Sequence, residues 1–251
     1  MIELPLQIPT PDGVSDAFLY HQPEAGPSPG VLHLTDIGGI RDSQRQMAGR
    51  LASQGYTVLL PNVFYRTGQP PLFDAPFKPG DEKSMKRLHE LSSPLTPDAM
   101  QRDAAAYVDF LTSRNEASQD SSGKKRIGVV GYCFTGKMAM YAAAALPQVV
   151  AAVASFHGGG LCTADPASPH LLLPQIRARL YFGHATEDRS MNPEAIERFN
   201  AALAAWGGRY ESEIYEGARH GWTVPDSPAY NQPQADRAFA KLNELLTESR
   251  S

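Results

Sequence analysis

The feature that most constrains the fold is the glycine-flanked hexapeptide Gly131–Gly136, which lies between the apolar run Ile127–Val130 and the helix-forming run Lys137–Ala142. A β-branched run, a tight glycine turn and a helix-forming run predict a strand, a sharp bend and a helix. Glycine permits such a bend where a Cβ atom would clash. The bend presents Cys133 at its tip, where the first N–H groups and the positive dipole end of the helix favour a thiolate nucleophile. The alternative is a buried cysteine that acts as a small hydrophobic residue.

Strand and helix patterns alternate from Val31 onward, and most of the expected strands are continuous apolar runs. This alternation predicts a mostly parallel sheet with helices on both faces, in a single α/β domain over residues 1–251. The expected strands are Glu3–Ile8, Ala17–Gln22, Val31–Leu34, Tyr56–Leu60, Ile127–Val130, Val149–Phe156, Arg177–His184 and Tyr210–Tyr215. The expected helices are Asp42–Gln54, Glu82–Leu91, Ala235–Leu246 and three that begin near Pro97, Gly136 and Pro193, while Pro61–Gly80 and Ser118–Lys125 are expected to be irregular.

Composition excludes several classes of function. The chain has 251 residues, of which 42% are hydrophobic, so it can bury a sizeable core. Its net charge of −4 and the lack of a basic stripe argue against nucleic acid as a partner. The sequence shows neither an apolar run long enough to span a membrane nor a secretory signal pattern at Met1–Leu6. Two cysteines, Cys133 and Cys162, make no disulfide framework, and we expect a cytoplasmic location.

A thiol nucleophile requires a base and an acid that orients the base. His220 lies in a glycine-flanked loop just after the last expected strand, and Asp188 lies just after the preceding strand. Because parallel strands end at one edge of a sheet, these residues can converge on Cys133. The order cysteine, aspartate, histidine matches the order of nucleophile, acid and histidine in α/β-hydrolases. Glu187 is the main rival for the role of the acid.

Acyl transfer also needs donors for the oxyanion that develops on the carbonyl oxygen. The expected donors are the backbone N–H groups of Phe134, after the nucleophile, and Ile37, in the loop after an earlier strand. The segment His157–Gly160 looks like the oxyanion motif of lipases, but it follows the nucleophile in the chain. We interpret it as a strand-end loop that borders the pocket.

Three segments carry a specific resemblance: Gly131–Cys133, the strand-end loop Gly183–Asp188, and Tyr215–His220. With them, the chain from Val31 to the final helix resembles the dienelactone hydrolase family. The resemblance implies an α/β-hydrolase fold, a Cys-Asp-His triad and hydrolysis of a lactone or activated ester with no cofactor and no metal. It also implies that Asp36 occupies the position of a family glutamate that contacts the resting thiol. Thr135 stands where this bend often carries glycine, which implies a slightly wider contact between helix and strand.

The family's dienelactone enzymes bind the substrate carboxylate with arginines, one of them shortly after the catalytic histidine. Here Gly221–Pro225 contains no arginine, and Trp222 instead predicts an apolar wall of the pocket. We expect Tyr132 to contribute to the pocket as well, and Arg66 to be a candidate carboxylate ligand. Further basic candidates are Lys83, Lys86 and Arg87.

The sequence therefore predicts a hydrolase that cleaves a small ester or (di)enelactone through a thioester on Cys133. One alternative is a general carboxylesterase of the same fold with an apolar pocket. A second is a redox-sensing thiol protein in which Cys162 is the partner of Cys133. A third is an inactive binding module with the same fold. The sequence leaves open whether the chain is a monomer or a small homo-oligomer.

Overall fold

The computed structural model describes residues 1–74, 77–78, 80–119 and 123–249, and within them eight strands form one sheet in the order β1-β2-β4-β3-β5-β6-β7-β8. β1 pairs antiparallel with β2, and β2 pairs antiparallel with β4, whereas all the other neighbours are parallel. The strands are β1 Ile2–Thr10, β2 Gly13–His21, β3 Gly30–Leu34, β4 Thr57–Pro61, β5 Ile127–Tyr132, β6 Val150–Phe156, β7 Arg179–Glu187 and β8 Tyr210–Arg219. This mostly parallel sheet confirms the expected α/β architecture.

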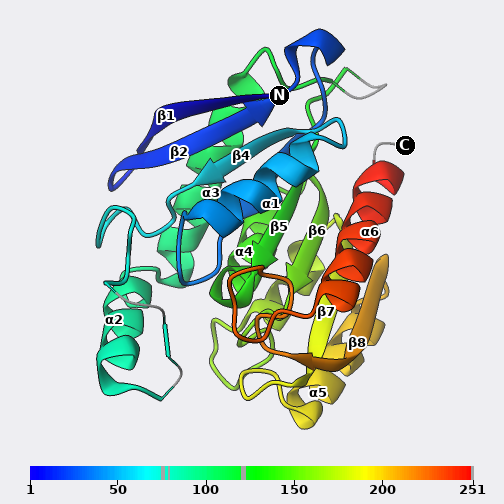
Figure 1. The fold of residues 1–251 in the computed structure, drawn as a ribbon. Coiled ribbons are helices and arrows are strands. Elements are labelled where there is room, and N and C mark those ends of the chain that lie inside the picture. Colours follow the sequence, from blue (N-terminus) through cyan, green and yellow to red (C-terminus); the bar gives the residue numbers. More distant parts are fainter. Residues whose placement is uncertain (75–76, 79, 120–122, 250–251) are drawn as a thin grey trace.

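Helices cover both faces of the sheet (Figure 1). On one face lie α1 and α6, and on the other lie α3, α4 and α5, while α2 packs at the periphery. Their bounds are α1 Asp42–Ala52, α2 Glu82–Ser92, α3 Pro97–Ser113, α4 Gly136–Ala145, α5 Pro193–Trp206 and α6 Gln232–Glu248. No helix among the described residues is long and apolar enough to cross a membrane.

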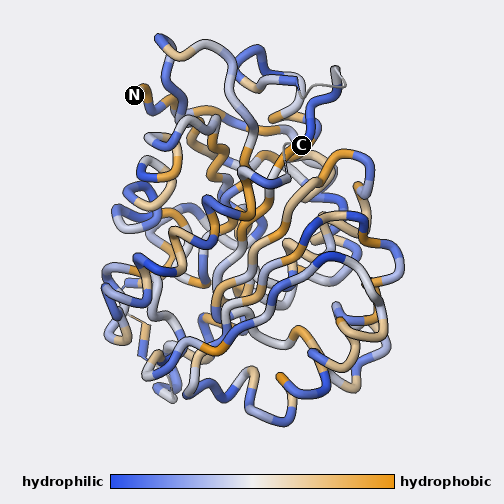
Figure 2. Tube along the Cα trace, turned by 90° about the vertical axis from the view of Figure 1, so that its right-hand side faces the viewer, coloured by the Kyte–Doolittle hydropathy of each residue, from blue (hydrophilic) through white to orange (hydrophobic). Residues whose placement is uncertain are grey.

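Side chains of the central strands point alternately to the two faces of the sheet, and this divides the core into two hydrophobic clusters. Ile127 and Val129 of β5 belong to the cluster under α3, α4 and α5, whereas Val130 and Tyr132 belong to the cluster under α1 and α6. Because successive side chains of a strand point to opposite faces, a continuous apolar run supplies both clusters. Figure 2 shows this arrangement: hydrophobic segments follow the strands through the interior, and hydrophilic segments lie mostly on the outside.

Side-chain caps set the starts of four helices. Asp81, Thr96, Asn192 and Asn231 each accept a hydrogen bond from the backbone N–H three residues later, which satisfies one unpaired donor of the first turn. Three of these helices also carry proline in the first two positions, where no intrahelical donor is needed.

The structure differs from the sequence expectation mainly at element ends. β7 continues to Glu187 instead of ending at His184, and β8 continues to Arg219 instead of ending at Tyr215, because β7 and the edge strand β8 continue to pair with each other, across a register shift, up to Glu187 and Arg219. A 3₁₀ helix at Pro169–Gln175 is also present where we expected no element. Ala75, Pro76 and Pro79 of the expected loop, and Asp120, Ser121 and Ser122 of the expected connection, lie outside the described residues.

Candidate active site

The bend after β5 holds Cys133 in a strained backbone conformation. Its φ angle is 55°, in the left-handed region that non-glycine residues rarely adopt. A 3₁₀ turn, Cys133–Thr135, joins β5 directly to α4. The flanking glycines are required by close packing: a Cβ atom at Gly131 would lie 2.4 Å from the Thr135 carbonyl oxygen, and one at Gly136 would lie 2.4 Å from Ser155 Oγ. The sequence pattern therefore produces a bend that raises the thiol above the end of β5.

Thr135 fastens this bend to the neighbouring strand. It is fully buried, its Oγ1 accepts a hydrogen bond from the Tyr132 N–H at 3.0 Å, and it lies 3.0 Å from the Leu34 carbonyl oxygen, to which it donates. The side chain thus occupies the space that a glycine would leave and links the end of β3 to the end of β5.

The structure brings Cys133, His220 and Asp188 together from three different strand ends. His220 Nε2 lies 3.0 Å from Cys133 Sγ, and His220 Nδ1 lies 2.7 Å from Asp188 Oδ2. Asp188 Oδ1 accepts two further hydrogen bonds, from the N–H and the Oγ of Ser190. The Asp188 side chain is 2% exposed, whereas the rival Glu187 is an exposed residue. Asp188 is therefore the carboxylate that contacts the imidazole.

Hydrogen bonds and charges among Asp188, His220 and Cys133 shift the pKa values of His220 and Asp188. Burial alone would lower the pKa of His220, but its hydrogen bonds to Asp188 and Cys133 and their charges outweigh burial and raise its pKa to about 10. For Asp188, burial opposes ionisation, but hydrogen bonds from His220 and Ser190 lower its pKa below the usual range. At neutral pH the site therefore holds a carboxylate next to a protonated imidazole.

His157, at the end of β6, contacts Cys133; the sequence placed its loop at the border of the pocket but predicted no contact with the cysteine. The Cys133 N–H donates to His157 Nδ1 at 3.1 Å, and His157 Nε2 lies 2.8 Å from Thr223 Oγ1. Because Nδ1 must accept, the proton of the neutral ring resides on Nε2. Burial and the charge of His220 both hold the pKa of His157 well below its ordinary value, so the ring stays neutral. In the sequence, the contact of His157 with Cys133 could be inferred only from its place directly after the strand that became β6, which is the neighbour of β5 in the sheet.

This contact bears on the expected oxyanion donors. The Cys133 N–H is already used by His157, so it is not free to bind an oxyanion. Phe134 is the second residue of the 3₁₀ turn, where the first N–H groups have no intrahelical partner. Ile37 follows β3, the strand next to β5, and no described residue accepts a hydrogen bond from its N–H. Phe134 and Ile37 thus remain the predicted donors.

A cavity of about 460 Å³ opens beside Ile37 and is walled largely by apolar side chains, among them Leu72, Phe73 and Phe77. Its one cationic residue among the described lining residues is Arg41. The guanidinium lies 2.6 Å from Asp36 Oδ1 and 2.7 Å from Asp226 Oδ2. Both carboxylates line the same cavity, so their negative charges neutralise the positive charge of Arg41.

This ion pair also corrects the expectation for Asp36. Its carboxylate accepts hydrogen bonds from Arg41 and from the Gly38 N–H, and no contact between it and Cys133 is formed among the described residues. The shorter aspartate side chain is held by its own loop instead of reaching the thiol.

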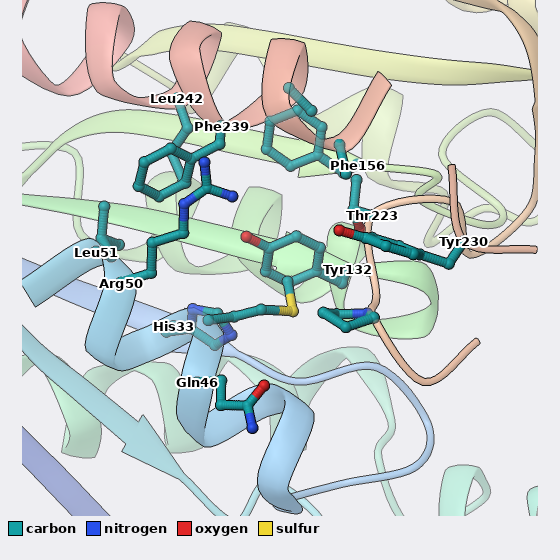
Figure 3. Close-up of a pocket in the computed structure, with 14 residues that line it drawn as sticks. His33, Gln46, Arg50, Leu51, Tyr132, Phe156, Thr223, Tyr230, Phe239 and Leu242 are labelled. Atoms are coloured by element: carbon teal, nitrogen blue, oxygen red, sulfur yellow. The ribbon is translucent and has the colours of Figure 1, made fainter. Parts of the chain in front are cut away.

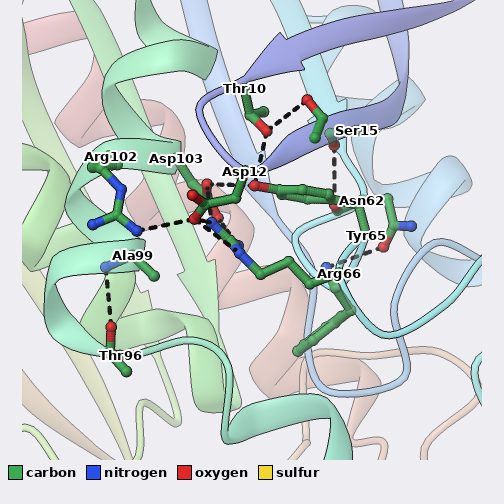
Figure 4. A network of polar contacts seen from close by, with 12 residues as sticks. Thr10, Asp12, Ser15, Asn62, Tyr65, Arg66, Thr96, Ala99, Arg102 and Asp103 are labelled. Atoms are coloured by element: carbon green, nitrogen blue, oxygen red, sulfur yellow. Dashed lines mark hydrogen bonds and ion pairs between the residues drawn. The ribbon is translucent and has the colours of Figure 1, made fainter.

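Arg66 does not serve the predicted pocket. Its guanidinium binds the buried Asp103 at 2.6 Å and Asp12 of the β1–β2 turn at 2.5 Å (Figure 4). Tyr65 donates to the same Asp103. The arginine therefore fastens the first hairpin to α3, and both of its partners are carboxylates of this chain, which leaves no charge for a substrate.

Trp222 and Tyr132 also lie elsewhere than expected. Trp222 is fully buried and packs edge-on against His157, with ring centroids 5.1 Å apart, so it supports that ring from behind and forms no wall of the cavity beside Ile37. Tyr132 points to the opposite side of β5, into the cluster under α1 and α6. Within the described part of the chain, no group of histidine, cysteine or acidic side chains is arranged to hold a metal ion.

The strand order, the bend after β5 and the order of the three residues define an α/β-hydrolase fold. The model of the dienelactone hydrolase family matches residues 15–249, and the chain belongs to this family. The carboxymethylenebutenolidase of Rhodococcus opacus is 28% identical over 217 residues, covering 84% of this chain and 79% of that protein.

Solved structures agree on the fold. A dienelactone hydrolase-like promiscuous phosphotriesterase from metagenomic libraries superposes with a TM-score of 0.79 at 20% identity, over the full length of both chains. The dienelactone hydrolase of Anabaena variabilis gives a TM-score of 0.68 at 18% identity, covering 98% of this chain and 97% of that one. With the family match, these comparisons make the chain a hydrolase of the dienelactone hydrolase type.

Proposed function

We propose that this chain hydrolyses neutral activated esters and enol lactones through a thioester on Cys133. The observation that carries the proposal is the continuous contact from Asp188 through His220 to the Cys133 sulfur, at 2.7 and 3.0 Å. A nucleophile within hydrogen-bond reach of a base that a third group orients is the recurring arrangement of covalent hydrolysis.

In the acylation half, the sulfur attacks the carbonyl carbon, and the carbonyl electron pair moves to oxygen. The N–H groups of Phe134 and Ile37 stabilise this oxyanion. When the intermediate collapses, the carbon–oxygen bond breaks and the alcohol leaves with the proton from His220. A stable leaving group such as a phenol or an enol favours this direction, because a poorer one would return the thiolate instead.

In the deacylation half, His220 takes a proton from water while the water oxygen attacks the thioester. Acylation removes the negative charge of the sulfur, which is one of the causes of the raised His220 pKa. The imidazole then becomes a better base for water at neutral pH. Collapse breaks the carbon–sulfur bond, so that ester and water yield acid and alcohol, and the thiol is restored.

The charges around the cavity favour a neutral substrate. Arg41 is paired with Asp36 and Asp226, and Arg66 is paired with Asp103 and Asp12. A neighbouring cavity, which shares Leu72 and Phe73, is lined by three lysines and one arginine together with three acidic residues. An apolar wall with compensated charges supports a general carboxylesterase specificity over recognition of a substrate carboxylate.

The redox alternative has less support. Both cysteines are free, and Cys162 is a buried member of the core cluster under α4. Cys133 instead contacts the imidazole of His220. The proposed activity needs a reduced thiol, which fits a cytoplasmic location and a small-molecule substrate.

The test compares Cys133→Ala with Cys162→Ala in the hydrolysis of p-nitrophenyl acetate, followed by release of p-nitrophenol. Loss of the nucleophile is expected to lower kcat/KM by on the order of 1000-fold or more, because the covalent route is lost. Cys162→Ala is the matched control and should retain activity within a few-fold. Activity of Cys133→Ala near that of the parent would refute the proposal.

A further inference from the structure

A second cavity lies between α1 and α6, on the side of the sheet that Tyr132 faces (Figure 3). Its volume is about 160 Å³. Tyr132 and Phe156 line it from the sheet, and Ala238, Phe239 and Leu242 line it from α6. Cys133, His220 and Asp188 are not among its lining residues, and the two cavities share no lining residue, although Thr223, the partner of His157, lines this one.

The size of this cavity corresponds to a single aromatic ring. An apolar protein cavity of about 150 Å³ accommodates benzene. Four aromatic side chains, Tyr132, Phe156, Tyr230 and Phe239, contribute to the lining, and aromatic rings prefer edge-to-face or offset contacts with a further ring. The rim is formed by exposed residues such as Gln46 and Tyr230, which leaves an entry from solvent.

Two buried polar groups in the lining define which substituent fits on that ring. Figure 3 shows the Tyr132 hydroxyl pointing into the cavity. Burial raises the pKa of Tyr132, so this hydroxyl remains a hydrogen-bond donor. His33 Nε2 lies 2.9 Å from Gln44 Oε1 and donates to it, so the bare Nδ1 is an acceptor. Nδ1 is buried and has no partner among the described residues. The lining thus offers both a donor and an acceptor.

The charge at the rim favours a neutral molecule. Arg50 is the one cationic residue in the described lining, and its guanidinium lies 2.9 Å from Asp236 and 3.9 Å from the centroid of the Phe239 ring. Because the carboxylate compensates this cation, the cavity does not select an anion.

We propose that the cavity between α1 and α6 is a binding site for a small phenol. The ring occupies the apolar space, and the hydroxyl accepts a hydrogen bond from Tyr132 and donates one to His33. A hydroxyl matches both groups at once, whereas an unsubstituted ring leaves both unpaired.

Phenol and benzene themselves are the probes, titrated by isothermal calorimetry into the full-length protein after its thiol has been alkylated with iodoacetamide. Alkylation blocks the site at Cys133, so any remaining binding belongs elsewhere. A ligand this small is expected to bind with a Kd of roughly 1 mM. Phenol should bind several-fold more tightly than benzene, because a net hydrogen bond is worth a few-fold in affinity.

Two substitutions locate the site. Tyr132→Phe keeps the ring and removes the hydroxyl, so it should weaken phenol binding several-fold and leave benzene binding unchanged. Ala238→Leu places a larger side chain in the cavity and should abolish binding of both probes. Folding of each variant is checked by thermal unfolding, and the comparison of phenol with benzene on the parent needs no variant.

Three results would overturn the proposal. The first is the absence of saturable phenol binding up to about ten times the expected Kd. The second is equal affinity for phenol and benzene. The third combines two observations: alkylation of Cys133 removes phenol binding, and a folded, unalkylated Ala238→Leu variant retains it. The phenol would then occupy the site at the thiol. None of these outcomes affects the proposed hydrolysis, which depends on Cys133, His220 and Asp188 and not on this cavity.

Discussion

At the scale of single residues, His220 determines how the site responds to pH. Its neighbours Asp188 and Cys133 raise its pKa from the ordinary 6.5 to about 10. The folded protein therefore binds this proton more tightly than the unfolded chain does. The resulting stabilisation is fully present below pH 6.5, and it is lost as the pH rises through about 10. Asp188 has the opposite sign: its lowered pKa contributes stability above pH 3.8, which is lost on acidification.

The prediction for His220 compares the parent with His220→Gln, which cannot titrate. The free energy of unfolding of the parent, relative to the variant, should be larger at pH 6 than at pH 10.5. Denaturant titrations under reducing conditions measure this difference. His89→Gln, which replaces an exposed histidine on α2, is the control. A difference between parent and His220→Gln that stays constant across this range would contradict the assigned contacts.

The sequence predicted that Cys133, Asp188 and His220 would converge, because each follows a segment that was recognisable as a strand, although Asp188 and His220 lie a few residues beyond the expected strand ends. It could not predict the partners of Asp36 and Arg66. Arg66 contacts Asp12 and Asp103, which are distant from it in the sequence and become neighbours only through the packing of the first hairpin on α3. Pairing of charged side chains depends on such tertiary contacts, which no local pattern encodes.

At the scale of elements, one hydroxyl group adds a link between the ends of β3 and β5, which also pair in the sheet up to Leu34 and Gly131. Thr135 Oγ1 bonds both the Tyr132 N–H and the Leu34 carbonyl oxygen. This link holds the loop with Ile37 next to the bend with Cys133, so the proposed oxyanion donors keep a fixed separation. The residue was recognisable in the sequence as a departure from glycine, but its bond to Leu34 depends on the parallel pairing of two strands distant in the chain.

Replacing Thr135 by valine keeps the shape of the side chain and removes the hydroxyl. The buried N–H and carbonyl groups then lose a partner, and the protein should lose about 1–3 kcal/mol of unfolding free energy. The rate of ester hydrolysis should fall as well, because the two donors are no longer held together. Thr135→Ser, which keeps the hydroxyl, is the matched control in urea unfolding and kinetic assays. Equal behaviour of the two variants would show that the link is unimportant.

At the scale of the whole molecule, the sheet order explains how residues from distant parts of the chain form one site. β3, β5, β6 and β7 are consecutive neighbours, and β8 follows them. Their carboxyl ends supply Ile37, Cys133, His157, Asp188 and His220. The alternation of apolar strands and helices sufficed to predict this edge of the sheet. The ends of β7 and β8 were not predictable, because their extension depends on pairing with each other and not on burial of an apolar run.

The cavity walls predict the charge preference of the enzyme. In Asp226→Asn, Arg41 loses one of its two carboxylate partners, and the wall gains positive charge. The ratio of kcat/KM for mono-p-nitrophenyl succinate to that for p-nitrophenyl butyrate should rise about fivefold, as expected for one charge interaction near a surface. Asp74→Asn is the matched control, since Asp74 lines the same cavity but pairs with Lys83. An equal rise in both variants would show a general charge effect and exclude a specific role of Arg41.

The most direct test of the central claim is to locate the acyl group during turnover. The protein is mixed with p-nitrophenyl trimethylacetate, whose hindered acyl group slows the attack of water, and the reaction is quenched with acid during the release of p-nitrophenol. Mass spectrometry of the digested protein should find the acyl group on Cys133, as a thioester that neutral hydroxylamine removes. An unmodified Cys133 during rapid turnover, or an acyl group on another residue such as Ser190, would contradict the account.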